Sequence, residues 1–149
     1  MIEVKRTNSQ NEDFIQLVAA LDKDLAIRDG DEHGFYAQFN KIANLNHVVV
    51  LYNNNIPVAC GAIKPYESNC MEVKRMFVPE TERGKGWASM VLTVLEKWAL
   101  ELGTSKLILE TGLKQPEAIA FYRKNNYTVI PNYGQYANIE NSVCFEKNL

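Results

Sequence analysis

Cysteine and histidine are scarce in this chain, and their scarcity excludes several kinds of site. The 149 residues contain three widely spaced cysteines, Cys60, Cys70 and Cys144, and two histidines, His33 and His47. An odd number of separated cysteines does not form a disulfide framework, and so few Cys and His residues argue against a zinc site built from them. We therefore expect no metal, a reducing cytoplasmic setting, and cysteines that serve as small apolar side chains.

Long apolar runs, a strong net charge and low-complexity segments are missing as well. No stretch approaches the length of a membrane span, and the first residues lack the apolar core of a signal peptide. The formal net charge is -2 and the sequence has no basic stripe, which argues against nucleic acid or an anionic membrane as partner. Because no linker or repeat interrupts the chain, we expect residues 1–149 to form one domain.

The hydrophobic pattern predicts a sheet of mixed direction covered by helices. Alternation predicts a strand over 2–6, and helical spacing predicts a helix that starts at a Ser9–Glu12 capping box and ends near Asp29-Gly30. The order of strands and helices predicts an antiparallel meander and then a strand–helix–strand crossover in an α/β fold. The further expected elements are a helix over 35–42, strands over 47–52, 56–64 and 70–78, a helix over 86–102, a strand over 106–110, a helix over 116–125, and strands over 127–130 and 142–146.

A glycine-rich turn, Arg83-Gly84-Lys85-Gly86-Trp87-Ala88, stands between a predicted strand and a predicted helix. A helix that begins there points unpaired N–H groups and the positive end of its dipole at one spot. Glycines let an anion such as a diphosphate approach the backbone, and the two basic side chains add positive charge. The run matches neither the P-loop nor the dinucleotide-binding fingerprint. From these residues alone, an anion site and a simple tight turn both remain open.

The strand before this turn carries an irregularity. Its apolar phase slips between Val73 and Met76, where Lys74 and Arg75 are adjacent charges. A bulge would account for the slip, and bulges often redirect side chains beside active sites. A plain amphipathic strand with solvated charges is the alternative.

The segment Arg83-x-x-Gly86-x-Ala88 resembles the Gln/Arg-x-x-Gly-x-Gly/Ala signature of the GNAT superfamily of acyl-CoA N-acyltransferases. The resemblance extends to the order of elements over nearly the whole chain and is strongest over 72–127. It implies a single-domain fold with a mostly antiparallel, twisted sheet of about seven strands and about four helices. It also implies acetyl-CoA as cofactor, with the pyrophosphate on the turn and the pantetheine arm along the preceding strand. The implied cofactor-binding residues are Met76, Phe77, Val78, Arg83, Gly84, Lys85, Gly86, Trp87, Ala88, Ser89, Gln115 and Tyr122.

The same resemblance suggests catalytic residues. The segment 117–127 is similar to the family's Ala-x-x-Leu-Tyr-x-x-x-Gly-Phe segment, which implies that Tyr122 is the general acid for the CoA sulfur. Two positions depart from the family pattern. Gln115, seven residues before Tyr122, stands where asparagine is frequent, and Asn126 stands where glycine is usual. For the base that takes the amine proton, Glu72 and Glu110 both qualify. We favour Glu72, because relatives commonly carry a carboxylate in that strand.

The sequence says less about the acceptor. We expect a primary amine of a small molecule or protein. Acidic residues around the first helix would attract a cationic amine or simply form a solvated face: Asp22, Asp24, Asp29, Asp31 and Glu32. The tyrosine-rich loop over 131–136 would line a pocket or pack at a homodimer interface. The leading function is an N-acetyltransferase, and the alternative is a non-catalytic CoA-binding sensor or partner-binding module on the same fold.

Overall fold

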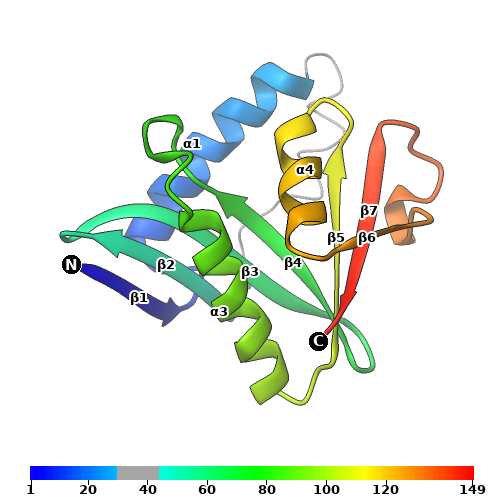
Figure 1. Cartoon of the computed structure of the whole chain (residues 1–149), viewed down its shortest axis with the longest axis horizontal. Coiled ribbons are helices and arrows are strands. Elements are labelled where there is room, and N and C mark those ends of the chain that lie inside the picture. The colour runs from blue at the N-terminus through cyan, green and yellow to red at the C-terminus, as the bar shows by residue number, and fades with distance from the viewer. Residues whose placement is uncertain (30–43) are drawn as a thin grey trace.

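A single seven-stranded sheet organises the molecule (Figure 1). The computed structural model describes residues 1–29 and 44–149. The strand order is β1-β2-β3-β4-β5-β7-β6, and every neighbouring pair is antiparallel except β4 and β5. The strands are β1 (Ile2–Thr7), β2 (His47–Asn53), β3 (Ile56–Glu67), β4 (Cys70–Phe77), β5 (Lys106–Gly112), β6 (Thr128–Ile130) and β7 (Ser142–Asn148).

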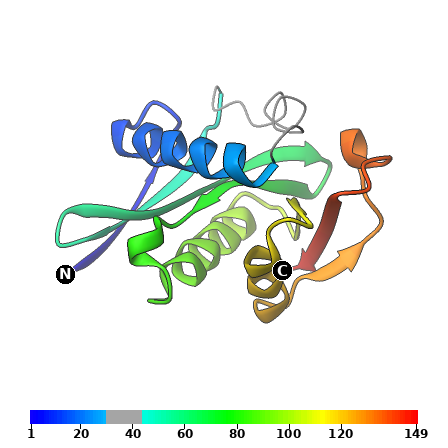
Figure 2. The same cartoon turned by 90° about the horizontal axis from the view of Figure 1, so that it is seen from above.

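Helices cover both faces of the sheet, as Figure 2 shows. Helix α1 and the 3₁₀ turn η3 lie on one side, and α3 and α4 lie on the other. Within the described residues the α-helices are α1 (Glu12–Asp29), α3 (Trp87–Glu101) and α4 (Pro116–Lys124), and the 3₁₀ turns are η2 (Glu80–Glu82) and η3 (Gly134–Tyr136). The predicted fold class and the strand–helix–strand crossover β4-α3-β5 are confirmed. The helix predicted over 35–42 lies outside the described residues.

Strand alternation gives the sheet a separate apolar layer on each face. In β2, successive side chains turn to opposite sides, and the strand is buried on both. One layer joins α1 to β2 through Phe14, Leu17, Val18, Val48 and Val50. The other joins α3 to β2 through Val91, Leu92, Leu95, Val49 and Leu51. Each fully buried aliphatic side chain of this kind stabilises the fold by about 1.5–3 kcal/mol.

The start of α1 differs from the predicted capping box. Asn11, not Ser9, caps the helix, because its Oδ1 accepts a hydrogen bond from the Phe14 amide at 2.9 Å. The Ser9 amide instead donates to the Leu45 carbonyl at 2.8 Å. Ser9 does stand three positions before Glu12, but Asn11 is nearer the start of the helix and caps it instead.

The three cysteines are buried thiols, as expected of apolar core residues. Burial raises the pKa of the Cys60 thiol to about 12, so that this group stays neutral. No helix among the described residues combines the length and the apolar character that crossing a membrane would require.

A bulge in β4 confirms the phase slip expected at Lys74 and Arg75. Lys74 faces Ala62 of β3, but Phe77 faces Cys60, so Arg75 and Met76 together stand opposite the single residue between them. Arg75 has a φ of 59°, the left-handed conformation that side chains other than glycine rarely adopt.

The bulge changes which face of the sheet the side chains occupy. Lys74 contacts Tyr136 of η3 and Arg75 contacts Asp22 of α1, so two consecutive cations lie on the same face. In a regular strand they would point to opposite faces.

β4 separates from β5 before the bulge. The two strands pair at Met71 with Leu107 and at Glu72 with Ile108, and no further pair joins them. β5 continues along β7 as far as Gly112. The later part of β4 therefore has an unpaired edge facing a gap in the sheet.

Gly61, opposite the bulge, provides the space that this arrangement needs. A Cβ at this position would lie 2.3 Å from Met76 Sδ and 3.0 Å from both Val91 and Leu95 of α3. We predict that Gly61→Ala lowers the free energy of unfolding by about 1–3 kcal/mol, because a crowded core must shift to accept it. Urea denaturation measures this value.

Gly112→Ala is the matched control. It is also a strand glycine, but its Cβ would meet nothing closer than 3.6 Å. We expect its stability to remain within about 0.5 kcal/mol of the parent. Equal stability of the two variants would show that the core between α3 and β3 accepts a methyl group at position 61 without strain.

Candidate active site

The glycine-rich turn leaves a row of backbone amides without protein acceptors. Gly84 and Gly86 have φ values of 82° and 85°, and a Cβ on either would meet no atom within 4 Å. Helix α3 begins after Gly86 without a side-chain cap. Within the described part of the chain, the amides of residues 84–89 have no hydrogen-bond acceptor. Because these amides lie at the positive end of the α3 dipole, the turn has the features of an anion site.

The basic side chains of the turn are held by the protein itself. Arg83 donates from Nε to the Val78 carbonyl at 2.9 Å and lies 3.7 Å from an Asp24 oxygen. Lys85 pairs with Glu82 at 3.2 Å. Their charge is partly compensated, so the backbone amides remain as the main anion-binding groups.

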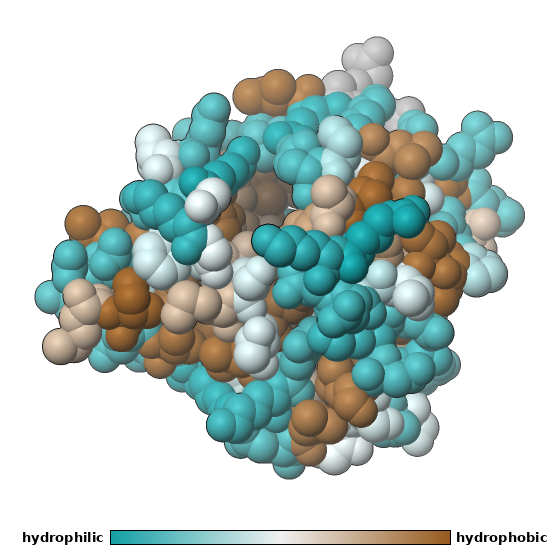
Figure 3. Space-filling view, in the orientation of Figure 1, coloured by the Kyte–Doolittle hydropathy of each residue, from teal (hydrophilic) through white to brown (hydrophobic). Residues whose placement is uncertain are grey.

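A cavity of about 400 Å³ opens beside this turn, and we call it the turn cavity. This volume lies within the range of small-molecule sites. Figure 3 shows a recess with a hydrophobic floor in this part of the surface. The residues expected to bind the cofactor line it, with the exception of Lys85: Met76, Phe77, Val78, Arg83, Gly84, Gly86, Trp87, Ala88, Ser89, Gln115 and Tyr122.

Helices α1 and α4 form the remaining walls, which the sequence did not reveal. Leu21 comes from α1, and Ala118 and Phe121 come from α4. Arg28 of α1 also pairs with Glu117 of α4 beside the cavity. The spacing of Ala118 and Phe121, three residues apart, could have indicated that they share one face of α4. Nothing in the sequence placed α1 beside the cavity.

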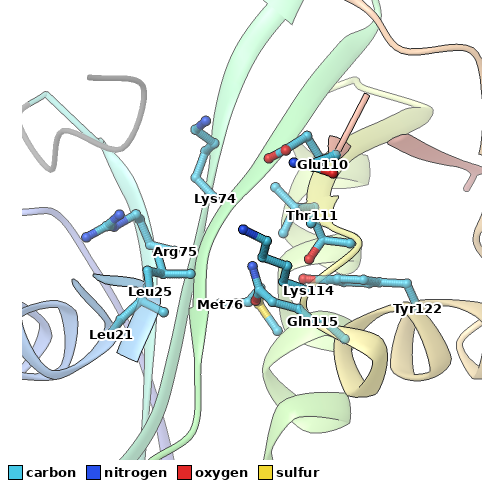
Figure 4. A pocket seen from close by; sticks show the side chains of 14 residues that line it. Leu21, Leu25, Lys74, Arg75, Met76, Glu110, Thr111, Lys114, Gln115 and Tyr122 are labelled. Carbon is cyan, nitrogen blue, oxygen red and sulfur yellow. The ribbon is translucent and has the colours of Figure 1, made fainter. Parts of the chain in front are cut away.

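A second cavity, of about 120 Å³, lies in the gap between β4 and β5, and we call it the gap cavity. Figure 4 shows Lys74 on β4 to one side, and Glu110 and Thr111 of β5 to the other. The two cavities share wall residues, among them Met76, Gln115 and Tyr122. They therefore meet at the Tyr122 side chain.

Tyr122 is held at this junction by aromatic packing. It is 7% exposed, and its ring lies edge-on to Tyr127 at 5.8 Å and beside Phe145 at 6.0 Å. Its hydroxyl has no hydrogen-bond partner among the described residues. Burial, together with the nearby Glu110 carboxylate, raises the pKa of Tyr122 above its usual value. The phenol is consequently neutral at physiological pH, which is the form that can donate a proton.

The two candidate bases occupy different positions. Glu110 lines the gap cavity, and its Oε2 accepts a hydrogen bond from Ser142 Oγ at 2.8 Å. Glu72 lines neither cavity and is 2% exposed. Its Oε2 accepts a hydrogen bond from the Tyr133 hydroxyl at 2.6 Å, and its Oε1 lies 3.8 Å from the Lys74 ammonium. The structure thus places only Glu110 where a bound substrate could reach it.

The tyrosine-rich loop turns inward. Tyr133 and Tyr136 meet edge-on at 5.8 Å, and Tyr136 is 2% exposed. Burial and the nearby carboxylates raise the pKa of both hydroxyls. These tyrosines form the wall behind Glu72 and Lys74.

Two acidic residues of α1 form ion pairs with arginines. Asp22 binds Arg75 at 2.6 Å, and Asp24 lies 3.3 Å from Arg28. These two carboxylates therefore do not form a free rim for a cationic substrate. Asp31 and Glu32 lie outside the described residues. Within residues 1–29 and 44–149, no group of three or more His, Cys, Asp or Glu side chains is arranged to hold a metal ion.

Comparison with known proteins gives a consistent result. The acetyltransferase (GNAT) family model matches residues 12–127. The chain is 31% identical to the IAA acetyltransferase of Azospirillum brasilense, over 99% of this chain and 98% of that protein. A structure assigned to the acyl-CoA N-acyltransferases, from Klebsiella pneumoniae, is 27% identical with a TM-score of 0.83, covering 100% of this chain and 98% of that one. The PaiA N-acetyltransferase of Thermoplasma acidophilum, solved in complex with coenzyme A, shares the fold at 15% identity, with a TM-score of 0.75 over 100% and 99% of the two chains.

The hydrogen bond between Tyr133 and Glu72 predicts a stability effect. Tyr133→Phe leaves a buried carboxylate without its shorter donor, and we expect the free energy of unfolding to fall by about 1.5–3 kcal/mol. Thermal or urea denaturation checks this.

Tyr66→Phe serves as control, since its ring packs edge-on against Tyr133 at 5.2 Å and its side chain is 38% exposed. The control should change stability by no more than about 0.5 kcal/mol. Losses of similar size in both variants would mean that the hydrogen bond to Glu72 contributes no more than a hydroxyl without this carboxylate partner.

Proposed function

The chain belongs to the acetyltransferase (GNAT) family, and on that premise we propose how its own residues transfer an acetyl group. The protein is an N-acetyltransferase that takes the acetyl group from acetyl-CoA and passes it to an amine. One observation carries the assignment of roles. The turn cavity and the gap cavity share Tyr122 in their walls, so this side chain lies where a donor in the first cavity would meet an acceptor in the second.

The turn cavity fits the donor. The amides of residues 84–89 have no acceptor in the described part of the chain, and the space above Gly84 and Gly86 is empty of protein atoms. These are the features that a pyrophosphate needs, because its oxygens accept several N–H bonds at close range. The CoA pyrophosphate would therefore bind at Gly84 to Ser89.

The unpaired edge of β4 would hold the pantetheine arm. Past Glu72, β4 has no hydrogen-bonded neighbour on its β5 side. An extended amide-bearing chain can add to such an edge as a further strand. Met76, Phe77 and Val78 line the turn cavity along this edge and would supply the backbone groups. An arm bound here runs toward Tyr122 and brings the thioester to the junction of the two cavities.

Glu110 and Tyr122 divide the proton transfers. An alkyl ammonium has a pKa near 10.4, so it must lose a proton before its nitrogen can attack the thioester carbon. Glu110 accepts this proton, with its carboxylate held in place by Ser142. As the C–S bond breaks, Tyr122 gives its proton to the sulfur. The nitrogen that forms the amide loses its second proton, which restores the Tyr122 phenol.

Glu72 has a supporting role in this scheme. It lies behind the gap cavity, held by Tyr133 and close to Lys74. Its carboxylate compensates the Lys74 charge. We therefore assign the base to Glu110, the other of the two carboxylates that the sequence put forward.

The pyrophosphate site is tested with a pair of glycines that have the same backbone conformation. Gly86 and Gly103 stand at opposite ends of α3 with φ values of 85° and 84°, and a Cβ added to either would meet no atom within 4 Å. Replacement by alanine should cost each about 1–2 kcal/mol of stability. Only Gly86→Ala should weaken CoA binding, by about tenfold, since only Gly86 lines the turn cavity.

Isothermal titration with CoA measures the difference between these variants. Equal CoA affinities for Gly86→Ala and Gly103→Ala would contradict the site.

The catalytic roles are tested by acetyl-CoA consumption with a panel of amines, including a lysine peptide. We expect Tyr122→Phe and Glu110→Gln each to lower kcat by about 10²-fold or more while CoA still binds. Without the base only the free amine can react, so kcat/KM of Glu110→Gln should rise with pH toward the pKa of the amine, near 10.4.

Tyr127→Phe is the control for the first variant, because this hydroxyl bonds Glu96 at 2.8 Å, outside both cavities. It should keep kcat within about twofold. An undiminished kcat in Tyr122→Phe would remove the general acid from the mechanism.

A further inference from the structure

Lys74 is a cation at the acceptor end of the site that the mechanism above does not use. It immediately precedes the bulge of β4 and lines the gap cavity together with Glu110 and Tyr122. Its side chain is only 10% exposed. A buried ammonium is costly unless its three N–H donors find partners, so its surroundings show what it is suited to bind.

The protein partners of Lys74 are incomplete. The nearest carboxylate oxygen, Glu72 Oε1, lies 3.8 Å away, and the Tyr136 hydroxyl lies 3.4 Å away. The Glu72 carboxylate lies closer to Tyr133 than to Lys74, because the Tyr133 hydroxyl donates a hydrogen bond of 2.6 Å to it. Burial lowers the pKa of Lys74, even though Glu72 and Glu110 act in the opposite direction. Three donors with two long contacts leave capacity for an anionic oxygen from the cavity.

The charged residues that line the gap cavity are three cations and a single carboxylate, Glu110. The cations are Lys74, Arg75 and Lys114. The Arg75 side chain is 2% exposed and paired with Asp22, and its Nε and Nη1 atoms have no partner within the described residues. Figure 4 shows Glu110 reaching from β5 toward β4, with the Lys114 amine extending into the same gap and Lys74 on its far side.

We propose that the acceptor is a small amine that also carries a carboxylate, with Lys74 binding this carboxylate while Glu110 receives the amine. This inference rests on the proposed function, in particular on Glu110 as the base. The two ends of such a substrate match the two opposite charges across the gap.

The charge pattern distinguishes this acceptor from other amines. A diamine would place its second ammonium next to Lys74, where two positive charges repel each other in a poorly solvated site. A lysine side chain within a protein has no carboxylate to offer at that distance, so the Lys74 donors would remain unsatisfied. A single carboxylate also fits better than a dianionic phosphate, because Arg75 is already bound to Asp22 and Glu110 adds a negative charge.

The test compares substrates that differ only in the carboxylate. Glycine, β-alanine, 4-aminobutyrate and 5-aminovalerate are each assayed beside the corresponding amide, together with 1,4-diaminobutane and a lysine peptide with blocked ends. The measured quantity is the ratio of kcat/KM for each acid to that for its amide. For the chain length that fits the gap, we expect this ratio to be about tenfold or more in the parent protein.

Variants at position 74 assign the preference to this residue. Lys74→Met should reduce the ratio to about one, and Lys74→Arg should retain most of it, because it keeps the charge. Lys5→Met removes an exposed strand lysine from β1, at the opposite edge of the sheet, and should leave the ratio at the parent value. CoA titration and thermal denaturation of each variant establish that it is folded with an intact donor site.

The outcomes separate this inference from the proposed function. If amides, diamines or peptides are acetylated as well as the acids, the carboxylate proposal is wrong while acetyl transfer stands. A preference for acids that survives in folded Lys74→Met excludes Lys74 as the binding group. If no amine is acetylated although CoA binds, both the proposed mechanism and this inference fail.

Discussion

The bulge in β4 is the constraint on which the site depends. Pairing between β4 and β5 ends at Glu72, and the bulge, with Arg75 and Met76 in the space of one residue, follows in the unpaired part of β4. An unpaired strand edge inside a sheet is unfavourable, because backbone groups there lose their partners. A fold keeps such an edge where a ligand can complete it, and this edge faces both cavities. The left-handed conformation of Arg75 is a local strain that persists because Gly61 and the Arg75–Asp22 ion pair fit it.

The same bulge determines the electrostatics of the gap. It places Lys74 and Arg75 on one face of the sheet, where a regular strand would have separated them. Two adjacent buried cations need compensation, and the protein supplies it unequally. Arg75 has a short ion pair with Asp22, whereas Lys74 has only distant partners because Tyr133 holds Glu72 more closely. Arg75 thus has a close counter-ion, whereas Lys74 has a more distant one.

Much of this arrangement could be predicted from the sequence, and the reasons are local. The phase slip at Lys74 and Arg75 identified the bulge, since alternation along a strand is a short-range property. The turn from Arg83 to Ala88 could be read for the same reason: the positive φ of its glycines and the free amides at a helix start need no distant contacts. Tyr122 was found only through resemblance to a family segment. The Ser9 capping box failed because Asn11 competed for the same helix start.

The sequence by itself determined the fold class and the order of the elements, because these depend on periodicity, and it suggested the proposed donor site through resemblance to a family motif. The tertiary structure decided the acceptor side, which is assembled from α1, β4, β5, α4 and the segment before β7. Two carboxylates that looked equivalent along the chain became different, as Glu72 was buried behind Tyr133 and Glu110 was left facing the cavity. Likewise, the pairing of Asp22 with Arg75 and of Asp24 with Arg28 could not be predicted from the sequence. Which charged groups pair with one another and which line a cavity depends on contacts between residues far apart in the sequence, and no local pattern records them.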